Sequence, residues 1–205
     1  MTAAAASIGV RDPGTVARWL APAVVVLALG TIVGLRWWAT RAGPEPLAVG
    51  AAFGLGLGAV ATVRALRPGL PAARSIGIGI AVGLGLALIT VAASSYAGLG
   101  VGTALGRPAA PFVPWAAITI VVATTEEAIL RGRLFDAVRR AGGLVPTLIV
   151  TTIAFALMHV PLYGWHVVPL DLAVGLALGG LRLATGGIAA PAAAHAVADL
   201  ATWWL

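Results

Sequence analysis

The sequence predicts an all-α fold, a polytopic transmembrane helical bundle of about seven spans. Hydrophobic residues make up 60% of the 205 residues. Charged residues make up only 10%, against about 25% in a typical soluble domain. The mean hydropathy is +1.01. A soluble fold of this length needs more polar groups to cover its surface, so many apolar side chains must face lipid.

Seven apolar runs supply the spans. At about 1.5 Å per helical residue, a hydrocarbon core about 30 Å thick requires about 20 residues. No obvious cleavage site of small residues follows the first run, so we expect a retained signal anchor. A straight helix from Pro114 to Gly142 would be about 42 Å long, so the fourth helix must tilt, bend or project from the membrane. In order, the predicted spans are residues 16–35, 47–63, 76–93, 112–130, 144–160, 167–181 and 188–205.

Glycine pairs four residues apart predict close contacts between some of these helices, because small residues let membrane helices approach each other. The sequence GLGLG at 54–58 does not match GxGxxG and follows no strand pattern, so we interpret it as a packing feature and not as a phosphate-binding loop. The pairs are Gly54 with Gly58, Gly79 with Gly83, and Gly175 with Gly179.

The arginines predict the orientation in the membrane. All 13 basic residues are arginine, and a cytosolic N-terminus places ten of them inside, as the positive-inside rule requires. The same orientation puts six of the seven tryptophans at the outer interface. We therefore predict a multi-pass protein of the cell membrane with its C-terminus outside. The arginines lie between apolar runs, which argues against nucleic-acid binding despite the net charge of +6. The outer side receives Arg36, Arg41 and Arg107, with His166 as an interfacial residue and Asp171 as an interfacial or helix-start residue.

Five ionisable residues lie deep inside predicted spans, where insertion of each costs about 2.5 to 3.5 kcal/mol. They are Glu126, Glu127, His159, His195 and Asp199. Residues four apart on a helix share one face. Glu126 is turned about 100° from Glu127, so only Glu127 is expected to pair with Arg131, and Glu126 should stay free. The pairs four apart are Glu127 with Arg131, Phe155 with His159, and His195 with Asp199.

Counting along the helices predicts that these groups meet. Glu127 lies 16 residues before Gly143, the expected turn, and His159 lies 16 residues after it. In an antiparallel hairpin the two are level. His195 lies about 12 Å into the last span, and Glu127 lies about 9 Å before Arg133. We therefore expect one cluster about 10 Å below the cytosolic face.

These motifs resemble those of the CPBP family of intramembrane proteases, which includes CAAX prenyl endopeptidases and bacteriocin-processing or immunity proteins of the Abi type. The family motifs are EExxxR, FxxxH, and HxxxN or HxxxD. All three occur here in order, each on a predicted span, and the resemblance covers about residues 112–205. The chain then divides into a cytosolic tail (1–15), three spans without motifs (16–111) and a catalytic core (112–205).

The resemblance implies hydrolysis of a peptide bond inside the membrane by a glutamate-activated water. In that reading Glu126 is the general base, His159 helps to hold the water, and His195 with Asp199 stabilises the oxyanion. Asparagine is commoner than aspartate at the last position. Because an ionised carboxylate cannot donate to an oxyanion, we interpret Asp199 as orienting His195. The candidate catalytic residues are thus Glu126, Glu127, His159, His195 and Asp199, with Arg131 and Phe155 supporting the site.

A mechanism without a metal cofactor is favoured, because HExxH is absent and no single helix presents two histidines. The alternative is zinc held by Glu126, His159 and His195. The expected partners are the lipid bilayer and a membrane-embedded or lipidated peptide or protein substrate. Two other functions stay open: a proton-coupled transporter, since buried acids and imidazoles also mark proton relays, and a non-enzymatic immunity or scaffolding protein. No duplicated halves, as in many transporters, are visible.

Overall fold

The predicted all-α bundle is confirmed. The computed structural model describes residues 13–43, 46–61, 72–96 and 110–204, and within these ranges every regular element is helical. In chain order the elements are α1 (Pro13–Ala42), α2 (Pro46–Ala61), α3 (Ala72–Tyr96), α5 (Phe112–Glu127), the π-helix η2 (Ala128–Leu134), α6 (Phe135–Gly142), α7 (Leu144–Tyr163), the 3₁₀ turn η3 (Trp165–Val167), α8 (Val168–Thr185) and α9 (Ala189–Ala201).

Each predicted span coincides with helix in the described residues, and the protein is a multi-pass membrane protein. Five helical segments are long and apolar enough to cross a membrane, and α2 is a shorter apolar helix. The last span is shorter than predicted, because α9 ends at Ala201. The backbone after it tightens into bonds three residues apart, from Thr202 N–H to the Asp199 carbonyl and from Trp203 N–H to the Leu200 carbonyl.

The fourth predicted span departs from a regular α-helix, as expected from its length. The continuous segment Phe112–Gly142 contains the π-helix η2, which begins directly after the two glutamates. Short π-helical stretches inside α-helices often occur at functional sites. Arg182 of α8 holds this stretch, with Nε donating to the Arg131 carbonyl at 2.9 Å and Nη2 to Asp136 Oδ1 at 3.4 Å.

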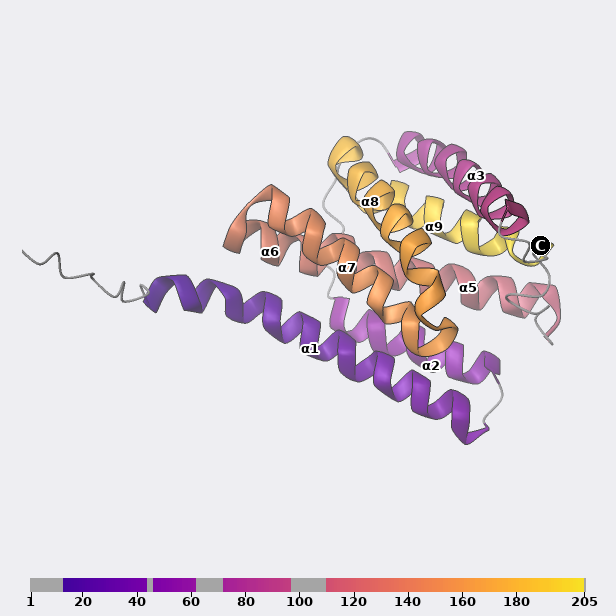
Figure 1. The fold of residues 1–205 in the computed structure, drawn as a ribbon, viewed down its shortest axis with the longest axis horizontal. Helices are drawn as coiled ribbons and strands as arrows, with labels where there is room; N and C mark the ends of the chain where they lie inside the picture. Colours follow the sequence, from indigo (N-terminus) through magenta and orange to yellow (C-terminus); the bar gives the residue numbers. More distant parts are fainter. Residues whose placement is uncertain (1–12, 44–45, 62–71, 97–109, 205) are drawn as a thin grey trace, which may run out of the picture.

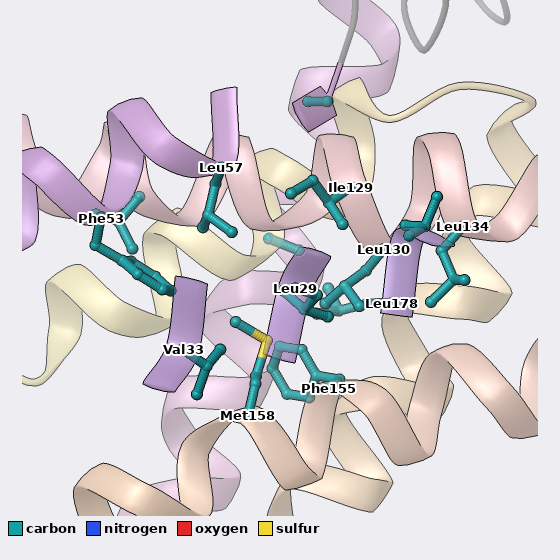
Figure 2. Packing of buried hydrophobic residues seen from close by; sticks show 14 of the residues in the cluster. Leu29, Val33, Phe53, Leu57, Ile129, Leu130, Leu134, Phe155, Met158 and Leu178 are labelled. Carbon is teal, nitrogen blue, oxygen red and sulfur yellow. The ribbon is translucent and has the colours of Figure 1, made fainter. Parts of the chain in front are cut away.

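The helices surround the α5–η2–α6 segment. In Figure 1, α1 and α2 lie along one side of the bundle, and α3, α8 and α9 lie along the other. Figure 2 shows how the buried side chains of the core meet around η2. The apolar residues there come from five elements, so the first two helices share one core with the motif-bearing helices. They include Leu29, Val33, Phe53, Leu57, Ile129, Leu130, Leu134, Phe155, Met158 and Leu178.

The predicted glycine pairs all lie at helix contacts. A Cβ at Gly83 of α3 would be 2.6 Å from the Ala194 carbonyl oxygen of α9, and Gly79 meets Ala190 in the same way. Gly175 of α8 packs on α7, where its added Cβ would lie 3.2 Å from Thr152 Cγ2. The pair in α2 faces α5. The α3–α9 contact is the tightest of these and sets the position of α9.

Gly83→Ala should therefore destabilise the protein by about 1 to 3 kcal/mol, because the added methyl group overlaps the α9 backbone. Gly85 lies on the same helix with nothing within 4 Å of an added Cβ, so Gly85→Ala is the matched control and should change stability little. Thermal unfolding in detergent, monitored by circular dichroism, measures the stability of both variants. Equal stability of the two variants would contradict the close α3–α9 contact.

Candidate active site

Glu127 and Arg131 form a buried ion pair one helical turn apart, as predicted. Arg131 Nη1 donates to Glu127 Oε1 at 2.8 Å, and both side chains are fully buried. Arg131 Nη2 donates to the Gly175 carbonyl of α8 at 2.9 Å. Its guanidinium carbon lies 4.7 Å from the ring centroid of Phe155 on α7. Because a buried ion pair loses its hydration, these additional contacts are needed to hold it, and they join η2 to two neighbouring helices.

His195 of α9 faces three carboxylates. Its Nδ1 lies 3.1 Å from Glu127 Oε1. Its Nε2 lies 3.7 Å from Glu126 Oε2 and 3.5 Å from Asp199 Oδ2. Ionised carboxylate oxygens only accept hydrogen bonds, so Nδ1 of the imidazole donates to Glu127. The predicted meeting of the fourth and seventh spans is confirmed, and the shortest contact that orients the imidazole comes from Glu127.

Asp199 lies at the open side of this cluster. Its side chain is 42% exposed, whereas the side chain of His195 is 4% exposed. Its Oδ2 faces the same imidazole edge as Glu126. The geometry is compatible with a role in orienting His195, although Glu127 contacts that ring more closely.

Glu126 pairs with a cation that the sequence analysis did not assign to it. Its Oε1 lies 3.9 Å from Arg36 Nη1 of α1, while its Oε2 faces His195. The prediction that only Glu127 pairs with Arg131 is confirmed, but the expectation that Glu126 stays free is wrong. The Arg36 guanidinium also lies 4.2 Å from the centroid of the Phe53 ring on α2, so two N-terminal helices form one wall of the site.

This contact also corrects the predicted position of Arg36. The predicted topology places Arg36 at the outer end of the first span and Glu126 near the inner face, on opposite sides of a core about 30 Å thick. Both placements cannot hold for groups 3.9 Å apart. Arg133, the predicted marker for the inner face, donates from Nη1 to the Val60 carbonyl at the end of α2, the end that the predicted topology also places inside. Arg36 therefore lies deeper in the bundle than predicted, against Glu126. Glu127 is the central residue of the continuous helical segment Phe112–Gly142, so the cluster lies halfway along it.

His159 of α7 lies one aromatic ring away from His195. The Phe155 ring is 4.8 Å from the His159 ring and 5.3 Å from the His195 ring, between centroids. His159 Nδ1 lies 3.0 Å from the Phe155 carbonyl oxygen and 3.5 Å from Asp171 Oδ2. Both of these oxygens can only accept a hydrogen bond, so Nδ1 of His159 carries the hydrogen and Nε2 is left as an acceptor.

Asp171 is predicted as an interfacial or helix-start residue, and it does lie in the first turn of α8, but its contact with His159 is not predicted. Its side chain is only 16% exposed and faces His159 from the first turn of α8. The turn that brings them together is at Gly164, which has a φ of 89°. His159 lies five residues before Gly164, and Asp171 lies seven residues after it. Counting outward from this glycine would therefore have placed the two residues at similar levels on neighbouring helices. His166, in η3, is exposed and lies apart from the cluster, as expected.

The alternative zinc set of Glu126, His159 and His195 does not fit the geometry. Zinc needs three or four protein donors around one point, each about 2 Å from the ion. Among the residues that the structure describes, no group of three or more His, Cys, Asp or Glu residues could hold a metal ion. Arg36 and Arg131 also bring positive charge to the two glutamates, which opposes a further cation there.

Comparison with known proteins points to one family. Residues 108–201 match the family model described as type II CAAX prenyl endopeptidase Rce1-like, over just under half of the chain. The matched part contains all three motifs and helices α5 to α9. No curated protein and no solved structure matches the chain. The resemblance predicted from the motifs is therefore confirmed for this region.

Proposed function

We propose, on the premise that residues 108–201 form a region of the type II CAAX prenyl endopeptidase family, that this protein is an intramembrane endopeptidase with a glutamate-activated water. The family match supports a protease. The observation that carries the glutamate mechanism is the position of Glu126, which is buried beside His195 and Arg36 and does not form the ion pair that occupies Glu127.

In this mechanism Glu126 takes a proton from water as the water oxygen bonds to the scissile carbonyl carbon. The carbonyl oxygen then carries negative charge, which His195, as an imidazolium, stabilises by donating from Nε2. The carbon–nitrogen bond breaks as the proton passes from Glu126 to the leaving amine. Glu127 keeps the imidazole aligned through Nδ1, and the acceptor Nε2 of His159 helps to orient the water.

Arg36 is part of this proposal as a residue that positions Glu126. Arg36→Gln should lower kcat about ten- to a hundredfold by loosening the Glu126 carboxylate, with a smaller effect on KM. Arg41→Gln is the matched control, since Arg41 lies on the same helix and stacks on Trp37 instead. Steady-state kinetics on a cleaved peptide distinguish the two variants. Equal kcat values for Arg36→Gln and Arg41→Gln would show that Arg36 does not position Glu126.

Cleavage is also proposed to need no metal, because the described donor set does not fit zinc. Activity should be unchanged after dialysis against EDTA or 1,10-phenanthroline. Loss of activity on chelation, with recovery on adding zinc, would contradict the metal-free mechanism.

The proposed substrate is a membrane-associated or lipidated peptide, including the prenylated C-terminal peptides that give the matched family its name. Purified protein in liposomes should release a shorter peptide from a prenylated peptide or from a transmembrane peptide, as detected by mass spectrometry. The unlipidated soluble form of the same peptide should be cleaved far more slowly. Absence of product from every membrane-bound peptide would favour the non-enzymatic alternative.

A further inference from the structure

A groove between α1 and α6 lies outside the glutamate cluster. It has a volume of about 420 Å³. The α1 wall is apolar, and the opposite wall carries Arg133, Ala137 and Arg140. A second cavity of about 570 Å³ lies across α6, lined in part by Arg139, Arg140 and Arg182. Arg140 therefore borders both cavities.

The charges around α6 favour an anionic ligand. The groove is lined by two arginines and by no acidic residue. In the neighbouring cavity the one acid, Asp136, faces Arg182 at 3.4 Å. Arg139 and Arg140 are exposed and form no ion pair with the described residues. Two adjacent guanidinium groups of this kind bind phosphate well.

The apolar wall of the groove has the form of a surface for an acyl chain. Leu20, Ala21, Val24 and Val25 make a stripe on one face of α1, and Leu20 and Val24 are 60% and 58% exposed. Arg133 and Arg140 are seven residues apart, about 10 Å along the opposite wall. The groove therefore has an apolar wall on α1 for an acyl chain and a positively charged wall opposite it for a phosphate.

Trp19 marks the level of the lipid headgroups at this end. Its indole packs against Gly142, where an added Cβ would lie 2.8 Å from Trp19 Cζ2. Tryptophan prefers the boundary between headgroups and hydrocarbon, and arginine pockets between membrane helices bind anionic headgroups.

We propose that the α1–α6 groove binds one anionic phospholipid from the surrounding bilayer. Its phosphate contacts Arg140, Arg139 in the neighbouring cavity adds positive charge beside it, and one acyl chain lies on Leu20 and Val24. This site is separate from the glutamate cluster and does not depend on the proposed protease activity.

Native mass spectrometry of the purified full chain tests the proposal, with phosphatidylglycerol and phosphatidylcholine of identical acyl chains added to detergent micelles. One phosphatidylglycerol should bind per chain, more tightly than phosphatidylcholine. Arg140→Gln should weaken binding about fivefold, and the double variant Arg139→Gln/Arg140→Gln further. Arg41→Gln, at the other end of α1, should have no effect. Equal binding of the two lipids, or unchanged binding by the double variant, would overturn the proposal.

Two further measurements test whether an acyl chain of the lipid occupies the groove. Val24→Trp should weaken binding by filling the groove, whereas Leu27→Trp, on an exposed position of the same helix outside the groove, should not. Glycerol phosphate at millimolar concentration should not displace the lipid. Displacement by glycerol phosphate, or binding to Val24→Trp equal to wild type, would mean that a free anion suffices and would overturn the lipid assignment.

Discussion

Purified Glu126→Gln protein is expected to lose cleavage activity by about a hundred- to ten-thousandfold while it stays folded. Glutamine has nearly the same shape as glutamate, but its amide cannot take up the proton of the attacking water. Arg36 and His195, the two partners of Glu126, keep their own contacts to Phe53 and Glu127 in this variant. The loss of activity is measured as the cleavage rate on a peptide that the wild-type protein cuts. Unfolding temperatures measured in parallel show whether the variant stays folded.

Asp136→Asn is the control for this experiment. Asp136 lies further along the same helical segment and pairs with Arg182 outside the cluster. It should keep near wild-type activity. If Glu126→Gln cleaved at the rate of this control, Glu126 could not be the general base.

Arg131→Met should be the most destabilising single change, by about 3 to 5 kcal/mol, because it leaves the carboxylate of Glu127 buried without its ion-pair partner. It also removes the hydrogen bond to the Gly175 carbonyl. Unfolding in detergent as a function of temperature or of added dodecyl sulfate measures the loss.

Two comparisons isolate this effect. The double variant Glu127→Gln/Arg131→Met removes both charges and should regain much of the lost stability. Arg74→Met replaces an exposed arginine on α3 and should change stability by no more than about 0.5 kcal/mol. If Arg131→Met and Arg74→Met were equally stable, the buried ion pair would not hold the bundle together.

Local spacing predicted the helices and the part of the site that lies on them. Hydropathy located the spans, and four-residue spacing gave the pair of Glu127 with Arg131, because both depend only on neighbours along one helix. Counting the helix rise along the fourth and seventh spans also predicted that His195 meets the glutamates, since this rise is nearly constant.

The missed features depend on how distant helices pack. The sequence predicts Arg36 only as a determinant of membrane topology, because nothing in its own span indicates that α1 lies against Glu126. Asp171 meets His159 only through the turn at Gly164. The length of the fourth span predicts a departure from a straight helix but not a π-helix after Glu127. The position of the π-helix depends on contacts with other helices, such as the hydrogen bond from Arg182 to the Arg131 carbonyl.

Cleavage of a membrane-bound peptide in heavy-oxygen water tests the central claim most directly. Mass spectrometry should find one heavy oxygen in the new C-terminal carboxylate made by the wild-type protein, with and without a chelator. Glu126→Gln protein at the same concentration should make almost none of this product. Product formed by Glu126→Gln at the wild-type rate, or only in the presence of added zinc, would contradict a glutamate-activated water at this site.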